Sequence, residues 1–364
     1  SALHQMLLRL HSPQTIATCR RAQAGGEFQG GVDQQVAILQ AAVRAGCQWV
    51  DIEIESLARA GAGLLRQFRP AKAIVSYHNY RKTPPLGPIY RRLGRLPAKV
   101  VKIASFAREL RDNLRLLRLL RAHRRRNPKL VTLGLGAAGI PSRLLALQRG
   151  CPFTYASVGN HLGVAPGQLP ADVMRSVYRV DHLDRRTQLY GVVGSHASVS
   201  LSPAMQNAAF QAKHVNAVYV PCETQRLADF LAFARLMGFQ GFSVTMPYKR
   251  AIIRDLDWLD PLATRIGACN TVAIQHGKWL GWNTDAAAVI EVLTKRLRLA
   301  GSRVLILGAG GAARAAAYAL RAEDAEVFIA ARREVAAQRL ARKVSAQVIP
   351  WGSTESLDVD VVIN

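Results

Sequence analysis

The segment from Val304 to Arg314 constrains the fold of this chain more than any other part of the sequence. It reads Val-Leu-Ile-Leu-Gly-Ala-Gly-Gly-Ala-Ala-Arg, so an apolar strand ends at Gly308 and an alanine-rich helix follows at once. Gly308 permits a tight turn, Gly310 lets the backbone approach a pyrophosphate, and Ala313 packs the helix on the strand. The helix N-terminus then faces the phosphates. The pattern predicts that a dinucleotide is bound by Gly308, Ala309, Gly310, Gly311, Ala312 and Ala313.

The end of the next predicted strand indicates which dinucleotide is bound. Residues 326–331 are predicted to form this strand, and Arg332 and Arg333 follow it. An NAD site favours Asp or Glu here for the ribose 2′-OH, whereas an arginine suits the 2′-phosphate of NADP. We therefore predict NADP as the cofactor, with Arg332 at its 2′-phosphate. A tight turn between strand and helix without a ligand is the alternative.

Composition limits the classes of protein to which the chain can belong. It has 364 residues, of which 49% are hydrophobic, enough for two or three domains with real cores. The net charge is +25, but the arginines are spread along the chain, with one local cluster at Arg121–Arg126 and no interleaved aromatic residues. This pattern favours an arginine-rich composition and anionic small substrates over a nucleic-acid partner.

Other features bear on location and partners. The sequence has no signal peptide and no apolar run of about 18 residues, so no membrane span is expected. The five cysteines are scattered without a Cys-x-x-Cys pair, which is typical of free thiols in a reducing cytoplasm. No metal site is expected, and the sequence leaves the oligomeric state open.

Short apolar strands alternate with helical stretches through the first 160 residues, and this alternation predicts a parallel sheet. Helices are expected at 33–45 and 105–126. The predicted strands are Thr15–Cys19, Trp49–Ile54, Ala73–Tyr77, Lys99–Ile103, Leu130–Leu135 and Phe153–Ala156. Six strands do not close a (β/α)8 barrel. The predicted fold class is therefore α/β, with an incomplete barrel followed by an α/β substrate domain and a Rossmann-type NADP domain.

These patterns also predict domain limits. The barrel is expected at 1–180, a polar linker at 181–188, the substrate domain at 189–286 and the NADP domain at 287–364. A helix is expected from Ala286 to Leu299. The chain stops within a predicted strand, so both the start of the barrel and the end of the NADP domain are expected to be missing.

The first group of candidate catalytic residues lies at the carboxyl ends of barrel strands. Lys102 lies within an apolar strand, where desolvation and nearby cations lower its pKa and make it a nucleophile toward a carbonyl. His78 ends the preceding strand and can move a proton beside the imine. Asp51 and Glu53 share one strand face, so they can balance the lysine charge or orient the histidine. Alternatively, Lys102 extends to the barrel rim and pairs with Glu53.

Residues 15 to about 180 resemble type I 3-dehydroquinate dehydratase. The resemblance rests on Thr18-Cys-Arg20 with Gly25-Gly26, Val50-Asp-Ile-Glu53, Ser76-Tyr-His-Asn-Tyr-Arg-Lys-Thr-Pro84, Val101-Lys-Ile-Ala104, Gly139-Ile-Pro-Ser-Arg-Leu144 and Ala165-Pro-Gly-Gln168. It implies that Lys102 forms a Schiff base with the 3-keto group and that His78 acts as general base and then general acid. It also implies that Arg20, Arg143 and Gln168 bind the substrate. Ala24 and Val164 depart from the family pattern.

The second group of candidate residues lies in loops rich in Gly or Pro, where a rigid scaffold can present polar groups. Lys249 and Asp285 can position and activate a proton donor for carbonyl reduction, and Asn270 lies in a similar loop. Ser200 and Ser202 offer hydroxyls that can recognise a carboxylate or a polyol. Alternatively, the Lys–Asp pair is a surface ion pair, and the serines cap the helix that begins near Pro203, with Ser202 at the N-cap.

Residues 189–364 resemble shikimate dehydrogenase. Five motifs occur in the family's order: Ser200-Leu-Ser-Pro203 with Asn207, Val244-Thr-Met-Pro-Tyr-Lys249, Gly267-Ala-Cys-Asn-Thr271, Asn283-Thr-Asp285 and Gly308-Ala-Gly-Gly-Ala312. The resemblance implies that Lys249 and Asp285 are the catalytic pair. It further implies that the substrate is held by Ser200, Ser202, Thr245, Asn270 and Asp285, and that NADP is held by residues 308–313 with Arg332.

The order of the two halves is similar to that of the fused plant-type enzymes of the shikimate pathway. This resemblance implies two reactions: dehydration of 3-dehydroquinate to 3-dehydroshikimate, then NADPH-dependent reduction to shikimate. The alternative is a shikimate or quinate/shikimate dehydrogenase whose barrel is impaired and only structural. A polyanion-binding protein built on these folds is a third possibility, and it would show steeply salt-dependent binding to nucleic acid.

Overall fold

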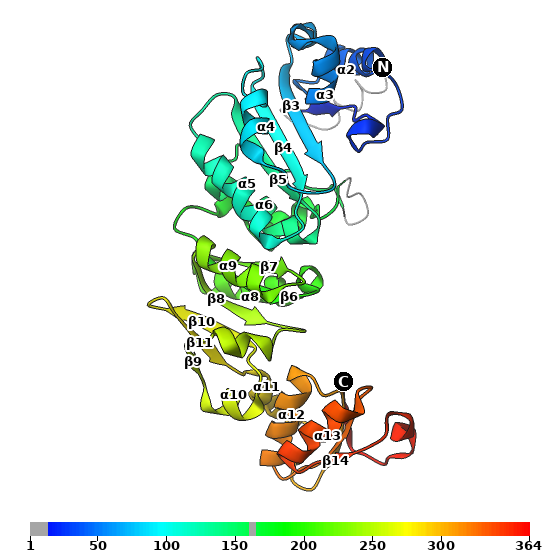
Figure 1. Ribbon diagram of the computed structural model, residues 1–364, viewed down its shortest axis with the longest axis vertical. Coiled ribbons are helices and arrows are strands. Elements are labelled where there is room, and N and C mark those ends of the chain that lie inside the picture. Colours follow the sequence, from blue (N-terminus) through cyan, green and yellow to red (C-terminus); the bar gives the residue numbers. More distant parts are fainter. Residues whose placement is uncertain (1–13, 160–164) are drawn as a thin grey trace. The chain divides into compact units, whose positions relative to one another are not determined.

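The structure is a computed structural model that describes residues 14–159 and 165–364 (Figure 1). The described residues form two compact units. Unit 1 comprises the described residues up to Gln188, together with Ser200–Cys222 and Asp229–Met237. Unit 2 comprises Leu189–Val199, Glu223–Ala228 and Gly238–Asn364.

Unit 1 contains an open, parallel sheet with the order β1-β2-β3-β4-β5. Its strands are β1 (Ile16–Thr18), β2 (Trp49–Glu53), β3 (Lys72–Asn79), β4 (Val100–Phe106) and β5 (Lys129–Leu135). The strands are nearly continuous apolar runs because helices cover a parallel sheet; every residue of β4 except Phe106 is buried. The prediction of an α/β fold with an incomplete barrel is confirmed.

The prediction of a sixth strand at Phe153–Ala156 is wrong. This segment is irregular, and the nearest pairing is an isolated bridge between Ser157 and Pro170. Phe153 and Tyr155 nevertheless pack against the core of the sheet. The apolar run therefore reflects burial of its side chains, while its backbone lacks a partner strand.

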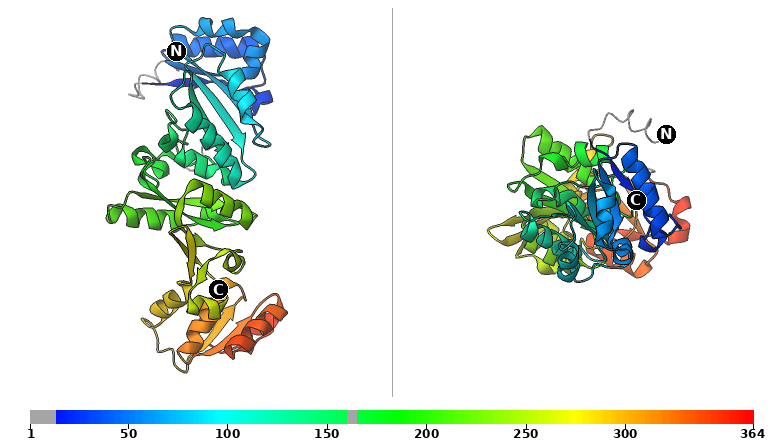
Figure 2. Two further views of the ribbon diagram at one scale, coloured as in Figure 1. Left: turned by 60° about the vertical axis from the view of Figure 1, so that its left-hand side comes forward. Right: turned by 90° about the horizontal axis from the view of Figure 1, so that it is seen from above.

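The first 237 residues also contain α-helices and a further strand. They are α2 (Val32–Arg44), α3 (Ile54–Ala60), α4 (Leu86–Leu93), α5 (Leu110–His123), α6 (Ile140–Leu145), α7 (Ala171–Ser176), α8 (Ser202–Ala212) and α9 (Leu227–Met237), with strand β7 (Ala217–Glu223). Helices α5 and α6 pack on β5 (Figures 1 and 2). Helix α5 begins five residues later than predicted because residues 105 and 106 still pair with β5 as part of β4.

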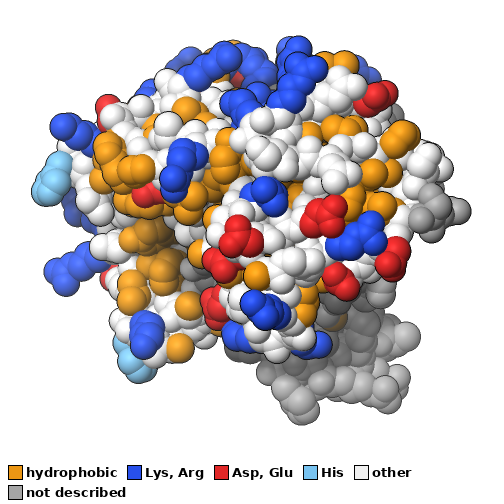
Figure 3. Space-filling model, turned by 90° about the horizontal axis from the view of Figure 1, so that it is seen from below, with side chains coloured by type: hydrophobic (Ala, Val, Ile, Leu, Met, Phe, Trp, Pro, Cys, Tyr) orange, Lys and Arg blue, Asp and Glu red, His pale blue; other side chains and the backbone are white. Residues whose placement is uncertain are grey.

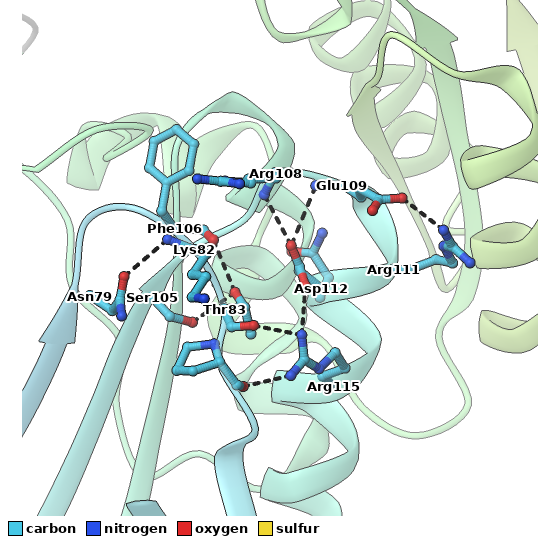
Figure 4. A network of polar contacts seen from close by, with 12 residues as sticks. Asn79, Lys82, Thr83, Ser105, Phe106, Arg108, Glu109, Arg111, Asp112 and Arg115 are labelled. Carbon is cyan, nitrogen blue, oxygen red and sulfur yellow. Dashed lines mark hydrogen bonds and ion pairs between the residues drawn. The ribbon is translucent and has the colours of Figure 1, made fainter.

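The start of α5 fixes the loop that follows β3 (Figure 4). Arg115 donates hydrogen bonds of 2.6 Å to the carbonyl oxygens of Thr83 and Pro84. The Thr83 hydroxyl lies 2.9 Å from the hydroxyl of Ser105 on β4, and Asp112 pairs with Arg115 at 3.1 Å. These contacts hold the loop at Thr83 and Pro84, which follows the carboxyl end of β3, against β4 and the start of α5.

Unit 2 contains two sheets. In the first, strands lie in the order β6-β8-β10-β11-β9, with bounds β6 (Gln188–Gly194), β8 (Phe239–Val244), β9 (Trp258–Leu259), β10 (Thr271–Gln275) and β11 (Lys278–Trp282). The second sheet is parallel with the order β14-β13-β12-β15. Its strands are β12 (Arg303–Leu307), β13 (Glu326–Ala330), β14 (Gln347–Val348) and β15 (Val361–Ile363).

The helices of unit 2 are α10 (Pro261–Ile266), α11 (Asp285–Leu293), α12 (Gly311–Ala322) and α13 (Glu334–Val344). Strand β12, the turn 308–310 and helix α12 follow one another as predicted. Helix α11 is shorter than the predicted 286–299 and ends at Leu293. Turns replace its expected last part, which begins with the β-branched Thr294, a residue of lower helix propensity.

The surface and the cysteines add three observations. On the face drawn in Figure 3, lysine and arginine side chains are interspersed with acidic and apolar ones. Within residues 14–159 and 165–364, no helix combines the length and the apolar character that a membrane crossing requires. All five cysteines are free thiols, and four of them are buried.

Candidate active sites

The carboxyl ends of β2, β3 and β4 bring the first group of candidate residues together. The strand register pairs Glu53 with Ser76, and Ser76 with Lys102. Successive side chains of a strand point to opposite faces, so Asp51 lies on the face of Glu53, and His78 lies on the face of Ser76. The parallel register therefore places all five side chains on one side of the sheet.

Asp51 is the centre of this group. Its Oδ2 lies 2.8 Å from Lys102 Nζ, its Oδ1 lies 3.2 Å from Arg20, and Ser76 donates a 2.6 Å hydrogen bond to Oδ1. The Asp51 side chain is fully buried and that of Lys102 is 7% exposed. Asp51, rather than Glu53, balances the charge of Lys102, so the alternative in which Lys102 pairs with Glu53 at the rim is wrong.

Glu53 has a separate role beside the same site. Its carboxylate accepts a 2.9 Å hydrogen bond from the backbone N–H of Arg21 and a further bond from the side chain of Gln35. One oxygen also lies 3.9 Å from Arg20. Glu53 thus anchors the segment that carries Arg20 and helps to hold that guanidinium over Asp51.

Burial and neighbouring charges determine the pKa values of the pair. Burial lowers the pKa of Lys102, and the charge of Arg20 lowers it further, against the opposing effect of Asp51. Burial alone would raise the pKa of Asp51, but the charges of Lys102 and Arg20 hold it well below the usual range. Asp51 therefore stays ionised, while the amine of Lys102 loses its proton more readily than a lysine in water.

His78 is held as a neutral imidazole. Burial lowers the pKa of His78 to about 2, with further contributions from Arg20 and Lys102. Arg20 lies 3.1 Å from its Nδ1, and because a guanidinium can only donate, Nδ1 accepts and Nε2 carries the proton. The ring stacks on Tyr80 with centroids 6.1 Å apart. Arg20 therefore fixes both the tautomer and the position of the ring.

The other predicted substrate residues of the barrel are less tightly grouped. Arg143 is 1% exposed, and burial lowers its pKa to about 10. Its Nε donates a 2.7 Å hydrogen bond to the carbonyl of Gly134, and its charge contributes to the lowered pKa of Lys102. Gln168 is half-buried in the segment after the undescribed residues 160–164. Val164 lies outside the described residues, and Ala24 ends a short 3-10 helix.

Two residues of this site were not predicted from the sequence. Ser76 links Arg20 to Asp51, and its spacing of two residues from His78 was an available signal. Tyr155 places its ring 4.2 Å from Lys102 Nζ, and its hydroxyl is buried without a hydrogen-bond partner among the described residues. No local pattern indicated Tyr155, because it lies in an irregular segment.

The second group of candidate residues meets at the start of α11 in unit 2. Lys249 Nζ lies 2.5 Å from Asp285 Oδ2, and Asn270 donates a 2.6 Å hydrogen bond to the other carboxylate oxygen. The backbone N–H of Thr284 in turn donates a 2.9 Å hydrogen bond to the side-chain oxygen of Asn270. Asp285 is the first residue of the helix, where the dipole favours a carboxylate. Asn270 and the start of α11 therefore hold the Asp285 carboxylate beside Nζ of Lys249.

This pair opens into a cavity of about 1250 Å³ within unit 2. Thr245 and the whole loop from Gly308 to Ala313 also line it. The side chains of Lys249 and Asp285 are 17% and 26% exposed, so the pair is partly buried and faces a cavity, unlike an ordinary surface ion pair. The arrangement is suited to a ligand that contacts both the loop and the Lys–Asp pair.

The loop itself fits a pyrophosphate. Gly308 has φ of 125°, which favours glycine, and a Cβ there or at Gly310 would meet open space. Gly310 caps α12, so the free N–H groups of the helix N-terminus face the cavity. Gly311 has a different role, because a Cβ there would lie 2.7 Å from Cβ of Lys249. The loop therefore also positions the stem of Lys249.

The predicted residues outside this cluster are placed as follows. Arg333 lines the cavity, while the predicted Arg332 is exposed and is not among the lining residues. Ser200 and Ser202 belong to unit 1. Ser202 is the first residue of α8 with Leu201 at the N-cap, and Ser200 accepts a 3.2 Å hydrogen bond from the N–H of Ser202. The interpretation of Ser202 as the N-cap is therefore wrong.

No metal centre is apparent in either region. Among the described residues, no three His, Cys, Asp or Glu side chains are grouped so as to hold a metal ion.

Two family models of known proteins match this chain, one in each half of the sequence. The family model of type I 3-dehydroquinase matches residues 2–185, and the model of the shikimate dehydrogenase substrate-binding domain matches residues 192–272. The bifunctional 3-dehydroquinate dehydratase/shikimate dehydrogenase of Arabidopsis thaliana, named as chloroplastic, is 32% identical over 92% of this chain and 58% of its own length.

Two further relatives match the second half. The NADP(+) shikimate dehydrogenase of Anaeromyxobacter sp. is 43% identical over 47% of this chain and 65% of its own length. The crystal structure of shikimate dehydrogenase from Aquifex aeolicus is 37% identical and covers 49% of this chain and 68% of that one, with a TM-score of 0.46. The chain thus spans less than two thirds of the length of each of the two curated relatives, from Arabidopsis and from Anaeromyxobacter.

The match to the type I 3-dehydroquinase model covers half of the sequence. The chain therefore belongs to the type I 3-dehydroquinase family, with a shikimate dehydrogenase substrate-binding domain following in the same polypeptide.

Proposed function

We propose that this chain is part of a bifunctional enzyme that dehydrates 3-dehydroquinate to 3-dehydroshikimate and reduces the product to shikimate with NADPH. The observation that carries the proposal is the Lys249–Asp285 pair, which faces one cavity together with the loop 308–313. The buried Lys102–Asp51 pair beside His78 supports the first reaction. The names of the relatives from Arabidopsis and Anaeromyxobacter support the choice of substrates and of NADP.

The dehydration uses the groups at the carboxyl ends of β2 to β4. Nζ of Lys102 attacks the 3-keto carbon, and the oxygen leaves as water when the imine forms. Nδ1 is the unprotonated nitrogen of His78, and it becomes available as a base when Arg20 turns from it to the substrate carboxylate. Nδ1 then takes a proton from the carbon next to the imine and later gives that proton to the departing hydroxyl. Arg20, Arg143 and Gln168 bind the carboxylate and hydroxyls of the substrate. Hydrolysis of the imine returns Lys102 as a free amine.

The reduction uses the cavity of unit 2. NADPH, when bound, supplies the hydride for the 3-keto carbon, and residues 308–313 with Arg332 or Arg333 hold its phosphates. Lys249 donates the proton to the developing alkoxide, and Asp285 keeps the ammonium in place. Asn270 and Thr245 bind the ring substituents of the substrate.

We assign the domains as a dehydratase part to residue 180, a linker at 181–188, a substrate domain at 189–286 and an NADP domain from 287. We also propose a reducing, cytoplasmic location, which the five free cysteines support. The partners are small anionic molecules, and neither nucleic acid nor a membrane is required.

Separate assays of the two half-reactions test this proposal. The protein is supplied with 3-dehydroquinate alone, and then with 3-dehydroshikimate and NADPH, and is compared with Lys102→Ala and Lys249→Ala. We expect Lys102→Ala to lose only the dehydration and Lys249→Ala to lose only the reduction. Reduction with borohydride should trap a substrate adduct that Lys102→Ala does not form.

The same assays decide between this function and a dehydrogenase with a structural barrel. A protein that reduces 3-dehydroshikimate, leaves 3-dehydroquinate unchanged and forms no borohydride adduct is the second kind. Reduction that survives Lys249→Ala unchanged would contradict the proposed role of the Lys–Asp pair in either case.

A further inference from the structure

Another cavity lies in unit 1, and it is lined almost entirely by arginines. It measures about 310 Å³ and is bounded by Arg121, Arg124, Arg149, Arg185 and Gln148. Arg121 and Arg124 lie at the carboxyl end of α5, whereas Arg149 ends a 3-10 helix (Leu147–Arg149) and Arg185 lies in the segment before β6. Three separate segments therefore direct guanidinium groups toward one hollow, which the proposed function does not use.

The backbone around this cavity is fixed. The amide of Gln148, which is 7% exposed, donates a 2.6 Å hydrogen bond to the carbonyl of Asp184. Asp184 also accepts a 2.9 Å hydrogen bond from the N–H of Thr187. A Cβ at Gly150 would lie 2.9 Å from Cβ of Arg124, so the stem of Arg124 packs directly on this glycine. The arginines thus project from an ordered frame.

The positive charge of this cavity is not paired with a carboxylate of the described residues. Within the part of the chain that the structure describes, none of its four arginines forms an ion pair with an acidic side chain. The charge of Arg185, followed by burial and by Arg125 and Arg121, lowers the pKa of Arg124. Nε of Arg149 is buried and has no acceptor among the described residues. Four like charges held together in this way repel one another unless an anion joins them.

We propose that this cavity is a binding site for a small phosphate-bearing anion. A planar guanidinium matches the oxygens of a phosphate with two parallel hydrogen bonds, and several arginines together favour a ligand with more than one negative charge. The volume suits a small molecule. No aromatic side chain lines the cavity for a base to stack on, which argues against single-stranded nucleic acid as the occupant.

Calorimetric titration of the protein with inorganic pyrophosphate at constant ionic strength tests this site. We expect saturable binding that Arg124→Gln/Arg185→Gln weakens about ten-fold or more, because each arginine supplies charge-assisted hydrogen bonds. The matched control is Arg44→Gln/Arg59→Gln, which removes two exposed charges of unit 1 that do not line the cavity. The control should bind as the unchanged protein does.

Several results would overturn the proposal. One is the absence of saturable binding at millimolar pyrophosphate, and another is equal weakening by both double variants, which would indicate general attraction. Binding that persists in Arg124→Gln/Arg185→Gln and disappears when NADP is added would place the anion at residues 308–313 instead. Displacement of pyrophosphate by single-stranded DNA with a steep salt dependence would identify a nucleic-acid surface.

Discussion

Each of the two proposed active sites uses a lysine paired with an aspartate, but the two pairs lie in different environments. Asp51 is fully buried with Lys102, and two further groups, Arg20 and Ser76, satisfy its oxygens. Asp285 and Lys249 are 26% and 17% exposed and face a wide cavity. A nucleophilic amine benefits from desolvation, whereas a proton donor must reach its substrate and keep its charge. The same residue types therefore serve different chemistry because burial differs.

The largest expected effect concerns the partly exposed pair, Lys249 and Asp285. Lys249→Met should lower kcat for reduction of 3-dehydroshikimate by about 1000-fold, since a positioned proton donor contributes about that much. The dehydration rate should be unchanged. The measurement is NADPH consumption, with Lys278→Met, an exposed lysine of β11, as the matched control. A loss of both activities in Lys249→Met would mean that the two sites are not independent.

The buried pair should instead dominate stability. Asp51→Asn leaves Lys102 and Arg20 without their counter-charge and should cost about 3 kcal/mol, as breaking a buried pair does. Asp285→Asn in the partly exposed pair should cost at most about 1 kcal/mol. Hydrogen exchange measures the two losses of stability. The β2–β4 amides are followed in Asp51→Asn and the α11 amides in Asp285→Asn. Equal costs in the two regions would contradict the contrast in burial.

The glycine-rich loop of the second site was easier to predict from the sequence than the partner of Lys102 in the first, for a physical reason. The turn at Gly308 and Gly310 is a local structure whose glycines are set by the strand and helix that they join, whereas the role of Gly311 against the distant Lys249 is visible only in the structure. The partner of Lys102 depends on the register of β2 and β4, which are not adjacent strands, so Asp51 and Glu53 remained equal candidates. Tyr155 and the missing strand at 153–156 were hidden because burial and strand pairing produce the same apolar pattern.

A smaller effect, on the free energy of unfolding, is expected from His78 as the pH falls. Its pKa is lowered to about 2 in the folded protein, against about 6.5 when unfolded. Below pH 6.5 the unfolded chain binds a proton that the folded one does not, so stability decreases as the pH falls. Between pH 7 and pH 5 this amounts to about 2 kcal/mol.

Urea unfolding of unit 1 at the two pH values measures this loss. His78→Gln should remove this part of the pH dependence, whereas His182→Gln, which changes an exposed histidine of the same unit, should retain it. A pH dependence that is the same in all three proteins would mean that His78 is not held neutral.

The smallest expected effect separates the two functions of the glycine loop. Gly311→Ala brings a methyl group within 2.7 Å of Cβ of Lys249 and must displace that side chain, so kcat for the reduction should fall about ten-fold. Gly310→Ala meets no atom of the protein and has φ of −79°, so it should leave kcat nearly unchanged. It should instead raise KM for NADPH, because the added methyl group occupies space that the pyrophosphate needs.

Steady-state kinetics with NADPH varied distinguish the two outcomes. If both variants change only KM, the loop binds the cofactor but does not position Lys249, and the coupling between cofactor loop and catalytic pair inferred from their contact is absent.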